Sequence, residues 1–169
     1  AQANAAFAAG QWREACEAYA SGLSDLVAAS AGAAATGMEM SLRLNLAACA
    51  LRQGEPAKAL EYADSALSLS PSAKAHFRRA QALQALGRLA EAEEATATVL
   101  ELEPASKDAM RLRSQIQSAV ATSADADAVI APALVEAGLH GMDVRMNRVA
   151  RRAAHADERA ARKFLDIAL

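Results

Sequence analysis

Apolar and polar positions follow a helical spacing along the first two thirds of the chain, interrupted at regular intervals by glycine and proline. Residues 72–104 can be aligned on residues 39–71 with an offset of 33 positions. The aligned pairs include Gly54 with Gly87, Ala59 with Ala92, Leu67 with Leu100, and Pro71 with Pro104. In both copies one helical segment precedes the glycine, a second follows it, and a proline closes the unit. The pattern therefore predicts a helical hairpin that occurs twice in succession.

A third, partial copy of the hairpin comes first, in residues 1–29. Gly10 corresponds to Gly54 and Ala15 to Ala59, but the two glycines are 44 positions apart rather than 33. The excess falls in the sequence AASAGAAATG, which is made of small residues and contains glycine. This segment predicts a lengthened surface connection after the first hairpin.

The composition agrees with an all-α fold and excludes several classes of protein. Ala and Leu supply 48 and 19 of the 169 residues, whereas Val, Ile and Thr together supply 14, so helix formers far outnumber strand formers. Charged or strongly polar residues interrupt every apolar run before the length of a membrane span. The net charge of −2 lacks the basic excess of a nucleic-acid-binding protein. We expect a globular helical domain with no nucleic acid and no membrane among its partners.

The repeat ends at Pro104, and the remaining sequence predicts further helices. Residues 105–122 form an amphipathic pattern with Met110, Ile116 and Val120 at apolar positions, as expected of a helix that caps the last repeat. Residues 124–139 are a further helical pattern that is kinked or started at Pro132, and residues 142–169 are Arg-rich and helical. We divide the chain into a repeat domain, 1–122, with repeats at about 1–29, 39–71 and 72–104, and a C-terminal helical extension, 123–169.

The period and the residues at fixed places resemble the tetratricopeptide repeat (TPR), a unit of about 34 residues. In that family a Gly ends the first helix, an aromatic follows, an Ala lies where the two helices touch, and a second aromatic comes four residues later. The first copy has all four: Gly10, Trp12, Ala15 and Tyr19. The later copies depart from the pattern at the aromatic places, with Pro56 and Ala63, then Leu89 and Thr96. The resemblance covers about residues 1–104 and implies a right-handed solenoid of three repeats, with the first helices lining a groove.

Four residues on the predicted first helices resemble the two-carboxylate clamp of TPR co-chaperones. That clamp binds the C-terminal Glu-Glu-Val-Asp of the seventy- and ninety-kilodalton heat-shock chaperones. The matching residues are Asn4, Asn45, Lys74 and Arg78. The family's fifth residue, a Lys, would lie four residues before Asn4, off the start of this chain, so that either upstream residues are missing or the clamp is weakened.

The residue types suit such a ligand, because a C-terminal Asp presents two carboxylates side by side. Lys and Arg supply several N–H donors, and an Asn amide can donate to a carboxylate while accepting a backbone N–H. Phe7, one turn after Asn4, and Phe77, beside Arg78, are candidates for apolar contact with the peptide. The resemblance thus implies a co-chaperone docking module whose partner is a chaperone C-terminal peptide.

No catalytic motif accompanies the repeats: the sequence contains no phosphate-binding glycine loop, nucleophile elbow or H-E-x-x-H helix. Cys16 and Cys49 lack metal-ligand or disulfide-framework spacing, so we expect buried structural thiols in a reducing, cytoplasmic setting. We predict neither enzyme activity, cofactor nor metal site.

Two alternatives remain open. One is a scaffold whose groove holds a non-chaperone segment, and the other is the docking domain of a larger enzyme, such as a prolyl isomerase or phosphatase. The segment NRVARRAAHADERAARKFL also resembles the first helical unit after the repeats in UCS-domain myosin chaperones, which suggests that the extension contacts a client protein.

Overall fold

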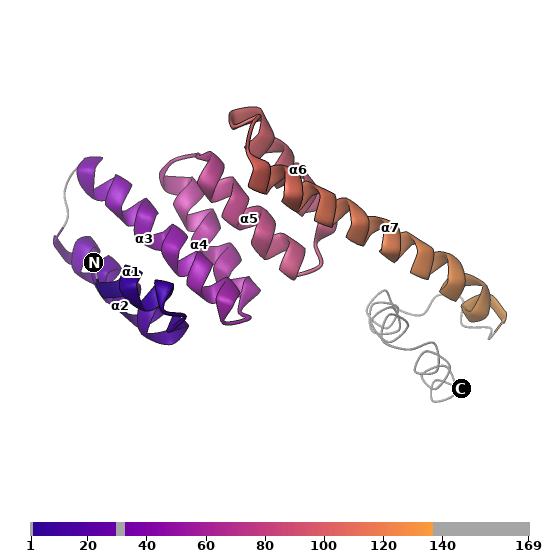
Figure 1. Ribbon diagram of the computed structural model, residues 1–169, viewed down its shortest axis with the longest axis horizontal. Helices are drawn as coiled ribbons and strands as arrows, with labels where there is room; N and C mark the ends of the chain where they lie inside the picture. The colour runs from indigo at the N-terminus through magenta and orange to yellow at the C-terminus, as the bar shows by residue number, and fades with distance from the viewer. Residues whose placement is uncertain (1, 30–32, 137–169) are drawn as a thin grey trace. The chain divides into compact units, whose positions relative to one another are not determined.

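The computed structural model describes residues 2–29 and 33–136, and every regular element in these ranges is an α-helix. Six of the helices pair into three antiparallel hairpins in chain order (Figure 1). The hairpins are α1 (Gln2–Ala8) with α2 (Trp12–Ala29), α3 (Ala33–Arg52) with α4 (Pro56–Leu69), and α5 (Ala73–Ala85) with α6 (Leu89–Leu102). The seventh helix, α7, spans Lys107–Glu136. The predicted all-α class and repeated hairpin are confirmed.

Each hairpin turns at the glycine that the sequence alignment singles out. Gly10, Gly54 and Gly87 have φ values of 77°, 74° and 74°, a left-handed conformation that glycine adopts without steric cost. The N–H of the residue after each glycine donates to a carbonyl five positions earlier in the preceding helix, at 3.0, 2.8 and 2.9 Å. This is the Schellman ending of a helix, and it fixes where the first helix of each hairpin stops.

Small residues allow the two helices of each hairpin to approach closely. Ala15, Ala59 and Ala92, the equivalent alanines of the three copies, have no exposed surface. Pro56 occupies the first position of α4, where its missing N–H leaves no hydrogen bond unmade. The alanines thus lie where the two helices touch, as the family pattern implies. The proline at position 56, where that pattern has an aromatic residue, does not disturb the hairpin.

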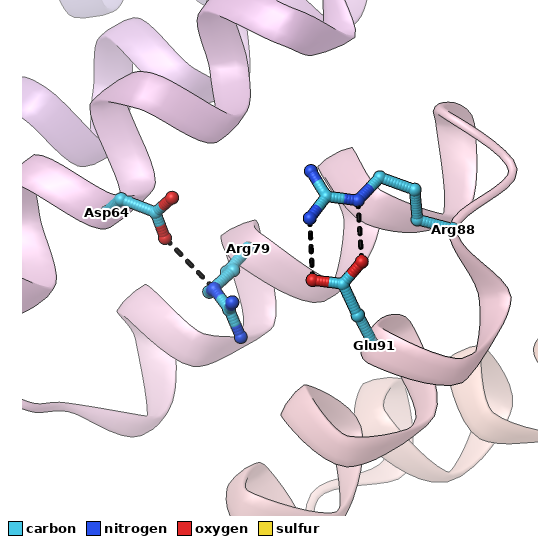
Figure 2. Close-up of polar contacts among 4 residues, drawn as sticks. All are labelled: Asp64, Arg79, Arg88 and Glu91. Carbon is cyan, nitrogen blue, oxygen red and sulfur yellow. Dashed lines mark hydrogen bonds and ion pairs between the residues drawn. The ribbon is translucent and has the colours of Figure 1, made fainter.

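Neighbouring hairpins are joined by apolar and ionic contacts. Leu44 of α3 packs in one buried cluster with Ala66 of α4 and Ala75 of α5. The Nε of Arg79 on α5 donates to a carboxylate oxygen of Asp64 on α4 at 2.9 Å (Figure 2). Helices α3 and α5, the first helices of two successive hairpins, are in direct contact.

The start of α6 is stabilised by an ion pair within its own first turn. Arg88 donates two hydrogen bonds to the carboxylate of Glu91, at 2.7 and 2.6 Å (Figure 2). This pairing lowers the pKa of Glu91. A negative charge in the first turn also interacts favourably with the positive end of the helix dipole.

The first turns of α7 cover the apolar face that the third hairpin would otherwise expose. Ala109, Leu112 and Ile116 are buried in clusters with residues of α5 and α6. Of the apolar positions named from the sequence, Ile116 belongs to this stripe, whereas Met110 and Val120 are exposed at 50% and 41%. Ala109, Leu112 and Ile116 are spaced three and four residues apart and therefore lie on one face of α7. Ala109 belongs to this buried face although its side chain is small, so a search for large apolar residues does not find it.

One predicted segment differs from the structure. Most of the segment AASAGAAATG, residues 28–37, is helical, because α2 continues to Ala29 and α3 begins at Ala33. The predicted surface loop is therefore wrong over most of its length, since alanine favours helix strongly enough to extend both flanking elements. Residues 30–32 lie outside the described residues.

Helix α7 continues across the predicted domain boundary at residue 122 to Glu136. Contacts divide the chain into two compact units, Ala1–Ile116 and Gln117–Leu169. The division at 122 stays a prediction. Residues 137–169, which include most of the predicted extension, lie outside the described residues.

Candidate functional site

The predicted clamp residues lie on the first helices of the three hairpins. Asn4 lies on α1, Asn45 on α3, and Lys74 and Arg78 on α5. Partly buried residues of α1 pack against a buried cluster that α2 and α3 form, and α3 and α5 are in contact. The fold thus places α3 and α5 in contact and connects α1 to α3 through this cluster.

Local sequence fixes the position of Lys74 at the start of α5. The hydroxyl of Ser72 accepts the backbone N–H of Ala75 at 3.3 Å and so caps the helix. Lys74 therefore lies in the first turn, with its side chain exposed, and Arg78 lies one turn later on the same face.

Arg78 is a half-buried cation with unused hydrogen-bonding capacity. One terminal nitrogen donates to Oε1 of Gln81 at 2.7 Å, while Nε is buried without a hydrogen-bond partner among the described residues. Burial lowers the pKa of the guanidinium, and the positive charge of Arg52 lowers it further. Because Arg stays charged at any physiological pH, this arrangement favours an approaching anion.

Asn4 and Asn45 have different surroundings. Asn4 is exposed, and its Oδ1 accepts the hydroxyl hydrogen of Tyr19 on α2. That contact leaves the amide N–H groups of Asn4 able to donate to a ligand. Asn45 is half-buried on α3, next in sequence to Leu44, which packs in the buried cluster with Ala66 and Ala75.

The two candidate aromatic residues are both part of the packing. Phe7 lies against a buried cluster and makes an edge-to-face contact with Trp12, with the ring centroids 4.9 Å apart. Phe77 packs against two buried clusters that residues of α5, α6 and α7 form. Both rings remain partly exposed, and Phe77 also lines a pocket.

That pocket lies between α5 and α7 and has a volume of about 390 Å³. It is lined by Phe77, Arg78, Gln81, Asp108, Arg111, Leu112 and Gln115. Phe77 and Arg78 are among the binding residues predicted from the sequence, and the other five are not. A usable signal is their spacing on α7, where positions 108, 111, 112 and 115 follow the i, i+3, i+4, i+7 pattern of one helix face. The sequence does not say that this face meets α5.

Arg52 is a second cation near this site, and it is not among the binding residues predicted from the sequence. It lies seven residues after Asn45 on α3, hence on the same face of that helix. Its guanidinium carbon lies 5.5 Å from the centroid of the Trp12 ring, within the range of a cation–π contact. Its charge acts on Arg78, so the positive potential around Arg78 extends to a neighbouring repeat.

The two cysteines are unpaired thiols. Cys49 is buried and Cys16 is half-buried, so the prediction of buried thiols is correct for Cys49 alone. Burial raises the pKa of Cys49 to about 11. Within the described ranges, no His, Cys, Asp and Glu residues gather in a group that could hold a metal ion.

Comparison with known proteins agrees with this architecture. The family model of the tetratricopeptide repeat matches residues 73–106. The second TPR domain of human RPAP3, solved in complex with the HSP70 peptide SGPTIEEVD, is 32% identical, with 69% of this chain and 89% of that chain covered and a TM-score of 0.58. The first TPR of Spaghetti (RPAP3), bound to the HSP90 peptide SRMEEVD, is 30% identical, with 71% and 88% covered and a TM-score of 0.61. The chain therefore belongs to the tetratricopeptide-repeat family.

The structure of the UNC-45 chaperone, which binds and folds muscle myosin, is similar at the level of the fold. It is 21% identical with a TM-score of 0.63, and the match covers 98% of this chain but 17% of that chain. The segment whose sequence resembles UCS-domain chaperones lies outside the described residues. Among curated protein sequences, none matches the chain. No helix in the described part of the chain is long and apolar enough to cross a membrane.

Proposed function

We propose that this TPR domain binds the C-terminal peptide of a heat-shock chaperone, ending in Glu-Glu-Val-Asp, through Asn4, Asn45, Lys74 and Arg78. The observation that carries the proposal is Arg78, a half-buried guanidinium with a buried, unpartnered Nε on the same helix face as Lys74. The two RPAP3-type domains that were solved with peptides ending in EEVD support it, since each is at least 30% identical.

The recognition chemistry follows from the terminal Asp of the peptide. Its main-chain and side-chain carboxylates need several donors, which the ammonium of Lys74, the guanidinium of Arg78 and the two Asn amides can supply. Partial burial of Arg78 strengthens its interaction with a carboxylate, because the local dielectric constant is lower than in water. Phe7 and Phe77 are the candidates for apolar contact with the Val side chain.

Calorimetry with a peptide ending in Glu-Glu-Val-Asp tests the proposal. We expect binding that weakens as salt rises, because the contacts join charged and partly exposed groups. A C-terminally amidated peptide should bind far more weakly, since it lacks one of the two carboxylates. Equal affinity for the amidated peptide would rule out the clamp.

Variants of the two cations separate a binding role from a structural one. Truncating a charge that meets a desolvated carboxylate costs about 2 kcal/mol or more of binding free energy, so Lys74→Ala and Arg78→Ala should lose at least roughly thirtyfold in affinity. Arg78→Lys should recover only part of the loss, because an ammonium lacks the planar fork of a guanidinium. Lys74→Ala should leave the melting temperature nearly unchanged, since Lys74 is exposed.

Arg113 provides the matched control for these variants. It is an exposed cation on α7 and does not line the pocket, so Arg113→Ala removes one positive charge from the same domain without touching the site. We expect its affinity to stay within about a factor of two of the parent value. If Arg113→Ala weakened binding as much as Lys74→Ala, net charge rather than a clamp would explain the affinity.

A further inference from the structure

The pocket between α5 and α7 shares Arg78 with the proposed clamp. Beyond Arg78 it is lined chiefly by polar groups from both helices: the amides of Gln81 and Gln115 and the charged groups of Asp108 and Arg111. A ligand held at Arg78 is therefore next to a second set of hydrogen-bond donors. A volume of about 390 Å³ is ample for one extended side chain.

The donors in this pocket are available to an incoming anion. Gln81 accepts from Arg78 through Oε1, which leaves its amide N–H groups able to donate. Arg111 has one ion pair among the described residues, with Asp108 at 3.7 Å, and both side chains are about three-quarters exposed. Such a pair contributes little free energy, so Arg111 can exchange Asp108 for a ligand carboxylate at small cost.

Two guanidiniums against one carboxylate give the pocket a net positive charge, which suits an acidic side chain better than an apolar one. We propose that this pocket binds the side-chain carboxylate of a glutamate that precedes the C-terminal Asp in the same bound peptide, with Arg111 as the residue that determines specificity for it. The proposal rests on the function proposed above. A single peptide can reach both sites, because Arg78 lines the pocket and belongs to the clamp.

Asp108 sets the limit on this affinity. Its carboxylate lines the same pocket and pairs with Arg111. It therefore competes with the ligand carboxylate for the guanidinium of Arg111, and its negative charge repels the ligand. The arrangement favours a ligand with a high density of negative charge, such as two consecutive glutamates, over one with an isolated acidic residue.

A double-mutant cycle between protein and peptide tests the proposal. Calorimetry would compare the parent chain and Arg111→Ala, each with the Glu-Glu-Val-Asp peptide and with peptides in which each glutamate in turn is replaced by glutamine. We expect Arg111→Ala to weaken binding of the parent peptide by about two- to fivefold, and to have no further effect on one of the two Gln-substituted peptides. Equal loss with every peptide, or no loss at all, would overturn the proposal.

Two further variants complete the test. Arg113→Ala, two residues along the same helix, should show no coupling to either glutamate, whereas Asp108→Asn should bind the parent peptide more tightly. Coupling of Arg113 equal to that of Arg111, or weaker binding by Asp108→Asn, would contradict an Arg111-specific contact.

The design also distinguishes the two proposals. If the parent chain binds the peptide and Lys74→Ala abolishes binding while Arg111 shows no coupling, the pocket inference fails and the clamp stands. If the parent chain does not bind the peptide, both fail.

Discussion

At the scale of single residues, α5 carries two half-buried side chains, Arg78 and His76, whose pKa values are both lowered by burial. Arg78 keeps its charge, because its ordinary pKa lies far above neutrality. His76 is different: Nδ1 is buried without a hydrogen-bond partner among the described residues. Burial lowers the pKa of His76 from its usual value, and the charge of Arg79 lowers it further. The domain therefore tolerates a buried arginine charge for binding but disfavours a protonated His76.

This lowered pKa predicts a loss of stability in mildly acidic solution. Between the native pKa of His76 and its unfolded value near 6.5, the unfolded chain binds more protons than the native one, so the free energy of unfolding rises with pH. The melting temperature should therefore fall as pH is lowered from 7.5 to 5.5. His76→Gln should flatten that dependence, as measured by thermal denaturation at several pH values. If the melting temperature of the variant depended on pH as steeply as that of the parent chain, titratable groups other than His76 would be responsible.

At the scale of elements, the glycine that ends the first helix of each hairpin has a left-handed backbone conformation, whereas a glycine inside a helix does not. Gly54 adopts φ +74° at the end of α3, whereas Gly22 lies within α2 with no positive φ. A Cβ at Gly22 would meet the side chain of Leu42 at 3.8 Å, an ordinary van der Waals distance. The two positions therefore respond in opposite directions to the same substitution.

Gly54→Ala should destabilise the domain by about 1–2 kcal/mol, because a residue with a Cβ pays that penalty in the left-handed conformation. Gly22→Ala should stabilise it by roughly 0.5–1 kcal/mol, because alanine is the better helix former. Urea denaturation of both variants measures the two free energies. Stabilisation by Gly54→Ala would contradict the left-handed turn.

The same elements show which features of the fold and of the candidate site could be predicted from the sequence. The alignment of Gly10, Gly54 and Gly87 predicted all three hairpin turns correctly, because only glycine meets that backbone requirement cheaply. Local patterns could not locate the start of α3 at Ala33, since alanine is compatible with both loop and helix. They also could not place Arg111 in the same pocket as Arg78, because the two residues lie on different helices, and helix periodicity defines a face but not the element that it meets.

At the scale of the whole molecule, the candidate site depends on the stacking of hairpins. Asn4, Asn45 and Lys74 come from three different hairpins, and no single hairpin contains the proposed clamp. The buried cluster of Leu44, Ala66 and Ala75 and the pair of Asp64 with Arg79 hold the second and third hairpins together. In a repeat protein, stability is approximately the sum of the intrinsic stabilities of the repeats and of such nearest-neighbour interfaces. A ligand that bridges the hairpins should therefore stabilise all of them together.

All clamp candidates and the pocket residues lie within the unit Ala1–Ile116, so a fragment of residues 1–122 should respond to the peptide as the full chain does. A ligand at a hundred times its Kd stabilises the native state by about 2.7 kcal/mol, and we expect the Glu-Glu-Val-Asp peptide to raise the melting temperature of both proteins by the same several degrees. The amidated peptide, and the parent peptide with Lys74→Ala, serve as controls and should produce little shift. A shift in the full chain that is lost in the fragment would show that residues beyond 122 contribute to binding, and the predicted division at residue 122 would then be wrong.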